Sequence, residues 1–264
     1  MTLRLPFLTS KPVVNVVRLQ GAITTAGNGL DDATLAGPLQ KAFTKGKPKA
    51  VALQINCPGG SPVQSSLIAA RIRRLSEEKG VPVIAFVEDV AASGGYWLAC
   101  SADEIHADSG SLLGSIGVIS AGFGLQELIG RYGIERRVHT AGNSKSMLDP
   151  FRPEKEEDVA RLNRWLEQLH GVFIDYVKSR RKGRLSDDPA LFEGEVWIGE
   201  NARGVGLIDG IGHLVPTMQK RFGEDVRFRR FGPKKSIFRR LGASVAAEAV
   251  GGLEQRAAFA RFGL

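Results

Sequence analysis

The sequence predicts an α/β protein built on a mostly parallel sheet. Three short apolar segments rich in Val, Ile and Ala end near glycine-containing turns, and each is followed by a helical pattern. Alternation of strand, glycine turn and helix is typical of βαβ units, in which helices join parallel strands. The chain has 264 residues, with 43% hydrophobic and 24% charged side chains, which suits one large globular domain or a domain with an appendage.

Three strand–helix pairs occupy the first hundred residues. The predicted strands are short runs bounded by Gly or Pro, and the helices show apolar residues at three- and four-residue spacing. In the second helix this spacing predicts a buried side that includes Val63, Leu67 and Leu75. In chain order, the strands cover residues 12–19, 50–56 and 82–88, and the helices cover 31–43, 61–79 and 96–100.

One long helix, over residues 154–182, dominates the second part of the chain. Its apolar side chains recur at helical spacing, Pro153 precedes a charged first turn, and basic residues close its end. Shorter elements are expected before it, namely strands at 104–107, 117–120 and 135–140 and a helix at 126–132.

The net charge of +8 is concentrated late in the chain. Residues 220–240 hold nine Lys or Arg and two Asp or Glu, so the remainder is nearly neutral. We therefore expect a folded domain over residues 1–219 and a basic amphipathic extension over 220–264. Such an extension suits an anionic membrane surface or a protein partner. A solvated tail and a nucleic-acid site are the alternatives, although no nucleic-acid motif accompanies the charge.

Several functional classes lack their sequence signatures here. No P-loop, no GxGxxG after a strand and no CxxC or HExxH metal motif occurs, so neither a metal nor a cofactor is expected. Cys57 and Cys100 predict reduced, buried thiols. No signal-peptide core or membrane-spanning run is found, so the expected location is the cytoplasm, with the extension at the inner face of the membrane.

Two glycine-rich turns follow predicted strands. Gly59 and Gly60 lie in the first, before the helix at Ser61, and Ser93 and Gly94 lie in the second. Backbone N–H groups at such turns approach a ligand closely, and a helix N-terminus favours negative charge, as an oxyanion hole requires. Ser93 also stands at the end of a parallel strand, where open sheets place their sites. The alternatives are a plain tight turn for the first and a helix N-cap for Ser93.

A serine nucleophile needs a base, and the four histidines are scattered without a partner at a recognisable spacing. A lysine serves instead where burial populates its neutral amine. Lys145, in a Gly/Asn/Ser loop before the long helix, is the candidate base, and an ordinary solvated lysine is the alternative.

Taken together, the motifs resemble one known family. Their order is that of the signal peptide peptidase A family, also called protease IV, over residues 13–215 or so. The matching runs are NCPGGS, PVIAFVEDVAASGGYWLACSADEIHAD, LLGSIGVIS, AGNSKSMLDPFRPEKEED and EGEVWIGENARGVGLIDGIG. The resemblance implies the ClpP/crotonase fold, a βαβ superhelix, and a serine peptidase with a Ser–Lys dyad.

The resemblance also assigns roles residue by residue. Ser93 matches the nucleophile, Lys145 matches the general base, and Ser115 matches the serine that orients the lysine. The oxyanion-hole positions match Gly59, Gly60 and Gly94.

The implied activity is that of an endopeptidase acting on extended peptides, such as signal-peptide remnants or unfolded protein segments. The family implies a homo-oligomer, a ring or dome with its sites at subunit contacts. Two alternatives are a non-catalytic or membrane-associated scaffold of the family and a crotonase-type acyl-CoA enzyme. The joint presence of Ser93, Ser115 and Lys145 disfavours the scaffold, and the absence of carboxylates at Ser93 and Lys145 disfavours acyl-CoA chemistry.

Overall fold

The computed structural model describes residues 11–25, 29–142, 144–232 and 258–264. The chain divides into two compact units, which we describe separately. Unit 1 comprises the residues up to Ile116 and those from Tyr176 onward, and unit 2 comprises Gly117–Asp175. Unit 2 is therefore an excursion of the chain between two parts of unit 1.

Unit 1 is built on a sheet that is parallel except at one edge. In the described residues the sheet has eight strands, in the order β6-β5-β3-β2-β1-β8, with β4 beside β3 and β7 beside β4. Only the β5–β6 pair in this part of the chain is antiparallel. The strands are β1 (Val13–Gln20), β2 (Ala50–Cys57), β3 (Val83–Ala92), β4 (Glu104–Ala107), β5 (Leu112–Gly114), β6 (Val196–Ile198), β7 (Gly210–Ile211) and β8 (Arg227–Phe231).

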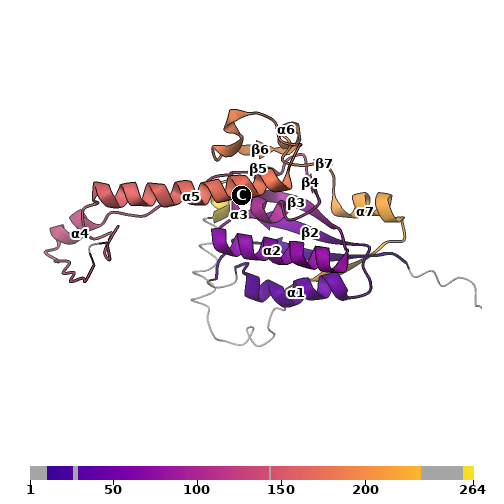
Figure 1. Cartoon of the computed structure of the whole chain (residues 1–264), viewed down its shortest axis with the longest axis horizontal. Helices are drawn as coiled ribbons and strands as arrows, with labels where there is room; N and C mark the ends of the chain where they lie inside the picture. The colour runs from indigo at the N-terminus through magenta and orange to yellow at the C-terminus, as the bar shows by residue number, and fades with distance from the viewer. Residues whose placement is uncertain (1–10, 26–28, 143, 233–257) are drawn as a thin grey trace, which may run out of the picture. The chain divides into compact units, whose positions relative to one another are not determined.

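Helices cover both faces of this sheet, and Figure 1 shows α1 and α2 side by side across one of them. The helical segments of unit 1 are α1 (Asp32–Thr44), α2 (Pro62–Lys79), α3 (Gly94–Ala99), η1 (Pro189–Phe192), α6 (Gly199–Gly204) and α7 (Leu214–Phe222), with the end of α5 (Glu156–Arg180).

Successive side chains of β1 point to opposite faces of the sheet, and so β1 contacts a helix on each face. Asn15 points to one face, where its side-chain amide donates to the carbonyl of Ala42 in α1 at 2.6 Å. Its neighbours Val14 and Val16 point to the other face and pack in a buried cluster with Met218 of α7. A strand buried on both faces reads as a continuous apolar run, which is why the first three strands were predictable from the sequence.

Unit 2 contains α4 (Gln126–Arg131) and the greater part of α5, both of which the sequence predicted. The strands predicted at 117–120 and 135–140 are wrong, because neither range, each fully described, forms a strand. Most of these residues are exposed and lie outside the sheet, so their β-branched side chains have no neighbouring strand to pair with.

The predicted domain boundary at residue 219 falls inside α7. Beyond it, β8 pairs in parallel with β1 and forms an edge of the sheet, and Val226 and Phe228 pack in the core below α7. The first part of the basic segment therefore belongs to unit 1. Residues 233–257 of the predicted extension lie outside the described residues, and their role stays a prediction.

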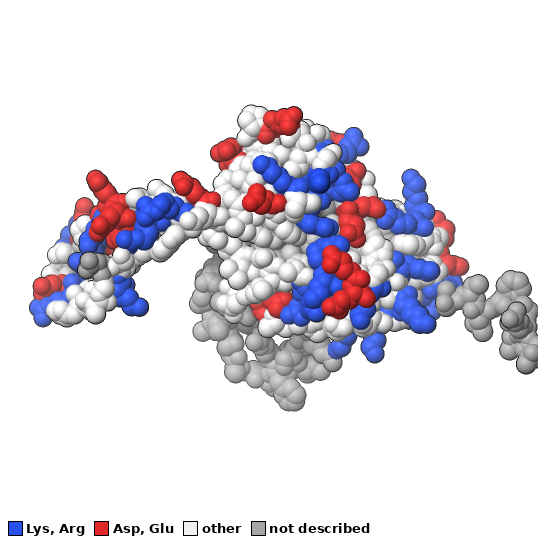
Figure 2. Space-filling view, in the orientation of Figure 1, with Lys and Arg blue, Asp and Glu red and all other residues white. Residues whose placement is uncertain are grey.

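Exposed arginines on β8 explain part of the basic charge. Arg227, Arg229 and Arg230 are exposed along this edge strand, where charge opposes pairing with another chain. Figure 2 shows Lys and Arg interspersed with Asp and Glu on the visible face. In the described part of the chain, no helix is both long enough and apolar enough to cross a bilayer.

Candidate active site

Ser93 occupies a strained turn between β3 and α3. Its φ of 52° and ψ of −123° belong to a region that residues with a Cβ rarely adopt, at a cost of order 1–3 kcal/mol. It sits at the N-cap position, yet its hydroxyl makes no capping hydrogen bond. The N-cap alternative is therefore wrong. A sharp strand-to-helix turn that presents a serine hydroxyl is the geometry of a nucleophile elbow.

The turn after β2 lies directly against Ser93. A Cβ on Gly59 would lie 2.8 Å from the Cβ of Ser93 and 3.0 Å from the amide nitrogen of Gly94. A Cβ on Gly94 would in turn lie 3.4 Å from the amide nitrogen of Gly60. The structure thus brings Ser93 and the three glycines together from two separate turns.

Backbone hydrogen bonds hold the first of these turns in place. The amide of Ile23 donates to the carbonyl of Gly59 at 2.8 Å, and the amide of Ser61 donates to the carbonyl of Ile23 at 2.8 Å. Among the described residues, no acceptor is found for the amides of Gly60 and Gly94. Two unsatisfied N–H groups beside a serine hydroxyl are suited to bind an anionic oxygen.

Ser115 follows the strand that supports Ser93. The amide of Ser93 donates to the carbonyl of Gly114 at 2.8 Å, and the amide of Ser115 donates to the carbonyl of Glu195 at 2.7 Å. Ser115 has a φ of 48° and is partly exposed. The structure therefore places Ser115 next to the residue that anchors the Ser93 backbone.

Lys145 belongs to unit 2, where it lies exposed in a turn and its amide donates to the carbonyl of Gly142 at 3.2 Å. Its pairing with Ser93 and Ser115 stays a prediction.

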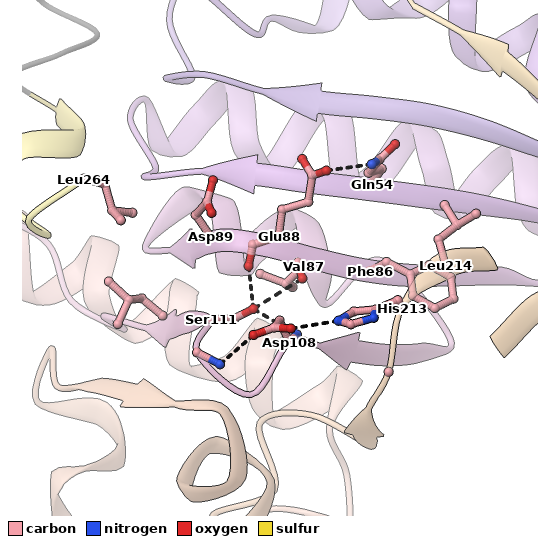
Figure 3. A pocket seen from close by; sticks show the side chains of 13 residues that line it. Gln54, Phe86, Val87, Glu88, Asp89, Asp108, Ser111, His213, Leu214 and Leu264 are labelled. Carbon is pink, nitrogen blue, oxygen red and sulfur yellow. Dashed lines mark hydrogen bonds and ion pairs between the residues drawn. The ribbon is translucent and has the colours of Figure 1, made fainter. Parts of the chain in front are cut away.

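Unit 1 also holds a cavity of about 660 Å³ beside the middle of β3, which the sequence did not predict. Figure 3 shows Ser111, Asp108 and His213 together in its lining. His213 pairs with Asp108 at 2.7 Å between Nε2 and Oδ2, and Ser111 Oγ accepts from the Asp108 amide at 3.0 Å. A catalytic triad places the histidine between the serine and the aspartate, and here the aspartate is between them. Residue types alone gave no signal for this cluster, because His213 comes from a part of the chain distant from Asp108 and Ser111.

The two thiols are confirmed as buried and free. Burial raises the pKa of Cys57 and of Cys100 to about 12, so both are protonated at neutral pH and neither is a nucleophile there. In the described ranges, no three His, Cys, Asp or Glu side chains are grouped closely enough to hold a metal ion.

Comparison with known proteins supplies the family. Residues 76–223, more than half of the chain, match peptidase family S49. The chain belongs to peptidase family S49. Over 76% of its length it is 32% identical to the chloroplastic serine protease SPPA of Arabidopsis thaliana, of which it covers 29%. It is also 32% identical to Protease 4 of Haemophilus influenzae, over 78% of this chain and 34% of that protein. These relatives confirm the predicted family and place the S49 chain in a class of serine peptidases.

A third relative carries a different kind of name. A protein of Brucella melitensis named Na(+)/H(+) antiporter NhaA is 47% identical over 95% of this chain, but the match covers 37% of that protein. Most of the Brucella protein lies outside the shared segment. The S49 chain thus spans about a third of the length of these three relatives.

The fold is confirmed by solved structures. A 1510-N membrane-bound stomatin-specific protease aligns over 92% of this chain and 98% of its own, with a TM-score of 0.54 and 18% identity. The likeness supports the predicted ClpP/crotonase-like α/β fold of the S49 chain.

Proposed function

We propose that the S49 chain is a serine endopeptidase with Ser93 as nucleophile and Lys145 as general base. The observation that carries this proposal is the Ser93 turn: a strained, partly exposed serine without a capping bond, packed against a glycine turn. Two solved relatives support the pairing, since one is a lysine-to-alanine mutant in complex with a substrate peptide and the other is a serine-to-alanine mutant.

In this mechanism the neutral amine of Lys145 takes the proton of the Ser93 hydroxyl. At the same time Ser93 Oγ bonds to the carbonyl carbon of the substrate. The amides of Gly60 and Gly94, next to Gly59, donate to the oxyanion, and Ser115 orients the lysine. The C–N bond then breaks and the lysine protonates the leaving amine. Water, deprotonated by the same lysine, attacks the acyl-enzyme ester, and the acid product leaves as the Ser93 hydroxyl is restored.

Extended peptides are the proposed substrates, among them signal-peptide remnants and unfolded protein segments. We further propose a homo-oligomer with its sites at subunit contacts, and a peripheral contact of residues 220–264 with anionic membrane at the inner face. Co-sedimentation with anionic liposomes at low and high salt measures that contact, and absence of binding at low salt contradicts it.

Hydrolysis of casein and of an unstructured peptide by the wild type, Ser93→Ala and Lys145→Ala tests the dyad. Each variant is expected to lose activity by a factor on the order of 10⁴ or more, because nucleophile and base act as a unit. The matched controls are Ser186→Ala and Lys155→Ala, at exposed positions outside the proposed site, which are expected to retain wild-type activity. Activity retained by Ser93→Ala or Lys145→Ala would overturn the dyad.

A further inference from the structure

The short helix α3, which starts at the strained Ser93, needs external support. It has six residues, all buried, and too few internal hydrogen bonds to be stable alone. A strained residue persists only where its surroundings over-determine it. The groups that hold α3 therefore also hold Ser93.

One turn of α5 supplies much of this support. Arg180 donates from Nε to the carbonyl of Cys100 at 2.9 Å and from Nη2 to the carbonyl of Ala102 at 3.0 Å. Cys100 is the C-cap of α3, where backbone carbonyls lack helical partners and a cation is favourable. Two carbonyls spaced in this way fit the fork of a guanidinium, whereas a lysine presents a single charged nitrogen.

Tyr176, one helical turn before Arg180, contacts the same helix. Its ring stacks on that of Trp97 with centroids 4.9 Å apart and an interplanar angle of 16°. Residues four apart lie on one face of a helix, so Tyr176 and Arg180 contact α3 from the same face of α5. A further bond holds α3, in which the hydroxyl of Tyr96 donates to the carbonyl of Leu207 at 2.7 Å.

The position of this turn in the chain gives it a second role. Tyr176 is the residue at which the chain returns to unit 1 from the excursion that carries Lys145. Unit 2 begins after Ile116, two residues beyond Gly114. The carbonyl of Gly114 accepts a hydrogen bond from the Ser93 amide. The departure side therefore bonds to the Ser93 backbone through Gly114, and the return side contacts α3 through the stack of Tyr176 on Trp97.

We infer that Arg180 and Tyr176 are positioning residues, which fix the Ser93 turn and the return point of the Lys145 segment to each other. This inference rests on the proposed function for its catalytic consequence. It concerns groups that touch neither substrate nor reacting atoms, and they act through α3.

Arg180→Lys in the full chain tests the inference, with Arg184→Lys as the matched control. Arg184 lies four residues on, is more exposed, and contacts Asp103 and Asp209 and not α3. We expect Arg180→Lys to lower kcat about 10- to 100-fold at nearly unchanged KM, since misplacement of the nucleophile affects the chemical step. Amide hydrogen exchange of residues 93–100 is expected to quicken in the same variant, and the control is expected to change neither quantity.

Tyr176→Phe and Tyr176→Ala separate positioning from mere packing. The phenylalanine variant keeps the stack and is expected to retain kcat, whereas alanine is expected to lower it as Arg180→Lys does. Unchanged exchange of residues 93–100 in Arg180→Lys, or unchanged kcat with an active wild type, would overturn the inference. A wild type without Ser93-dependent hydrolysis would instead overturn the proposed function, and hydrogen exchange alone would then decide the inference.

Discussion

Two features require glycine at position 60, namely a positive φ and the close approach of another part of the backbone. Its φ is +140°, and a Cβ there would lie 2.1 Å from the carbonyl oxygen of Ile23. Gly80 also has a positive φ, +61°, but a Cβ there would meet nothing within 4 Å. Gly80 therefore serves as a control position, since its left-handed α conformation tolerates a side chain better than the φ of Gly60 and no contact opposes one there.

Gly60→Ala is expected to destabilise the protein by roughly 1–3 kcal/mol more than Gly80→Ala, because the Ile23 backbone must move. It is also expected to lower peptidase activity about 10²- to 10³-fold, because moving the turn displaces the Gly60 amide and loss of one oxyanion donor typically has this effect. Urea unfolding and peptide hydrolysis measure the two effects. Equal behaviour of the two variants would contradict a role for the Gly60 turn.

The buried thiols give a second prediction at this scale. With a pKa of about 12 for Cys57 and Cys100, only about one thiol in 10⁴ is ionised at pH 8. Iodoacetamide is therefore expected to label neither cysteine in the native protein and both after denaturation, as read by mass spectrometry. Peptidase activity is expected to survive the treatment. Rapid native labelling of Cys57, with loss of activity, would point to a thiol mechanism instead.

At the scale of elements, a buried ion pair ties the end of α5 to the strands. Arg181, which is 2% exposed, donates to Asp209 at 2.8 Å and twice to the carbonyl of Gly206. Asp209 also accepts from the amide of Ile105 in β4 at 2.7 Å. Burial by itself would raise the pKa of Asp209, but the bonds from Arg181 and Ile105 lower it below its ordinary value of 3.8.

Asp209→Asn is expected to cost about 3 kcal/mol at pH 7, because Arg181 is left buried without its counter-charge. The folded pKa lies below the unfolded one, so the carboxylate stabilises the fold above about pH 4 and loses this contribution as pH falls through the folded value. The difference between wild type and variant is expected to shrink on acidification from pH 5 to pH 3. Denaturant unfolding across this range measures it, and a difference that stays constant from pH 5 to pH 3 would show that the charge of Asp209 is not its source.

The α2 helix shows how periodicity misplaces a face. The sequence predicted Val63 and Leu67 on its buried side, yet these are 62% and 47% exposed. Leu75 is buried as predicted, but Ile68 and Ile72 form the rest of the buried side. Two sets of apolar residues, on different faces of α2, recur at the three- and four-residue spacing of a helix. The packing of α2 against the sheet and α1 decides which set is buried.

At the scale of the whole molecule, apolar side chains are exposed in unit 2. Phe123 is 84% exposed, Ile119 77% and Tyr132 76%. Such side chains are available for the subunit contact that the proposed homo-oligomer requires. Phe123→Glu is expected to reduce oligomer size in size-exclusion chromatography and to abolish peptidase activity.

Val215→Glu, at an exposed apolar position of α7 in unit 1, is the matched control and is expected to leave both unchanged. Purified monomer that cleaves peptides at the full rate would show that the site is complete within one chain.

The sequence by itself determined the elements whose information is local. Strands β1 to β3 follow from continuous apolar runs, α1 begins after Asp31, whose carboxylate accepts from the Thr34 amide, and α5 follows from its long helical period. Glycine turns after β2 and β3 marked the candidate site for the same reason. These signals involve residues only a few positions apart, so they survive without knowledge of the fold.

Only the tertiary structure decided what depends on distant segments. It set the left-handed backbone of Ser93 against Gly59, added β8 to β1 and so drew part of the basic segment into unit 1, and put Arg180 under α3. Such contacts arise from sheet pairing and core packing between residues far apart in the chain. No local pattern encodes them, because each partner alone is an ordinary glycine, arginine or edge strand.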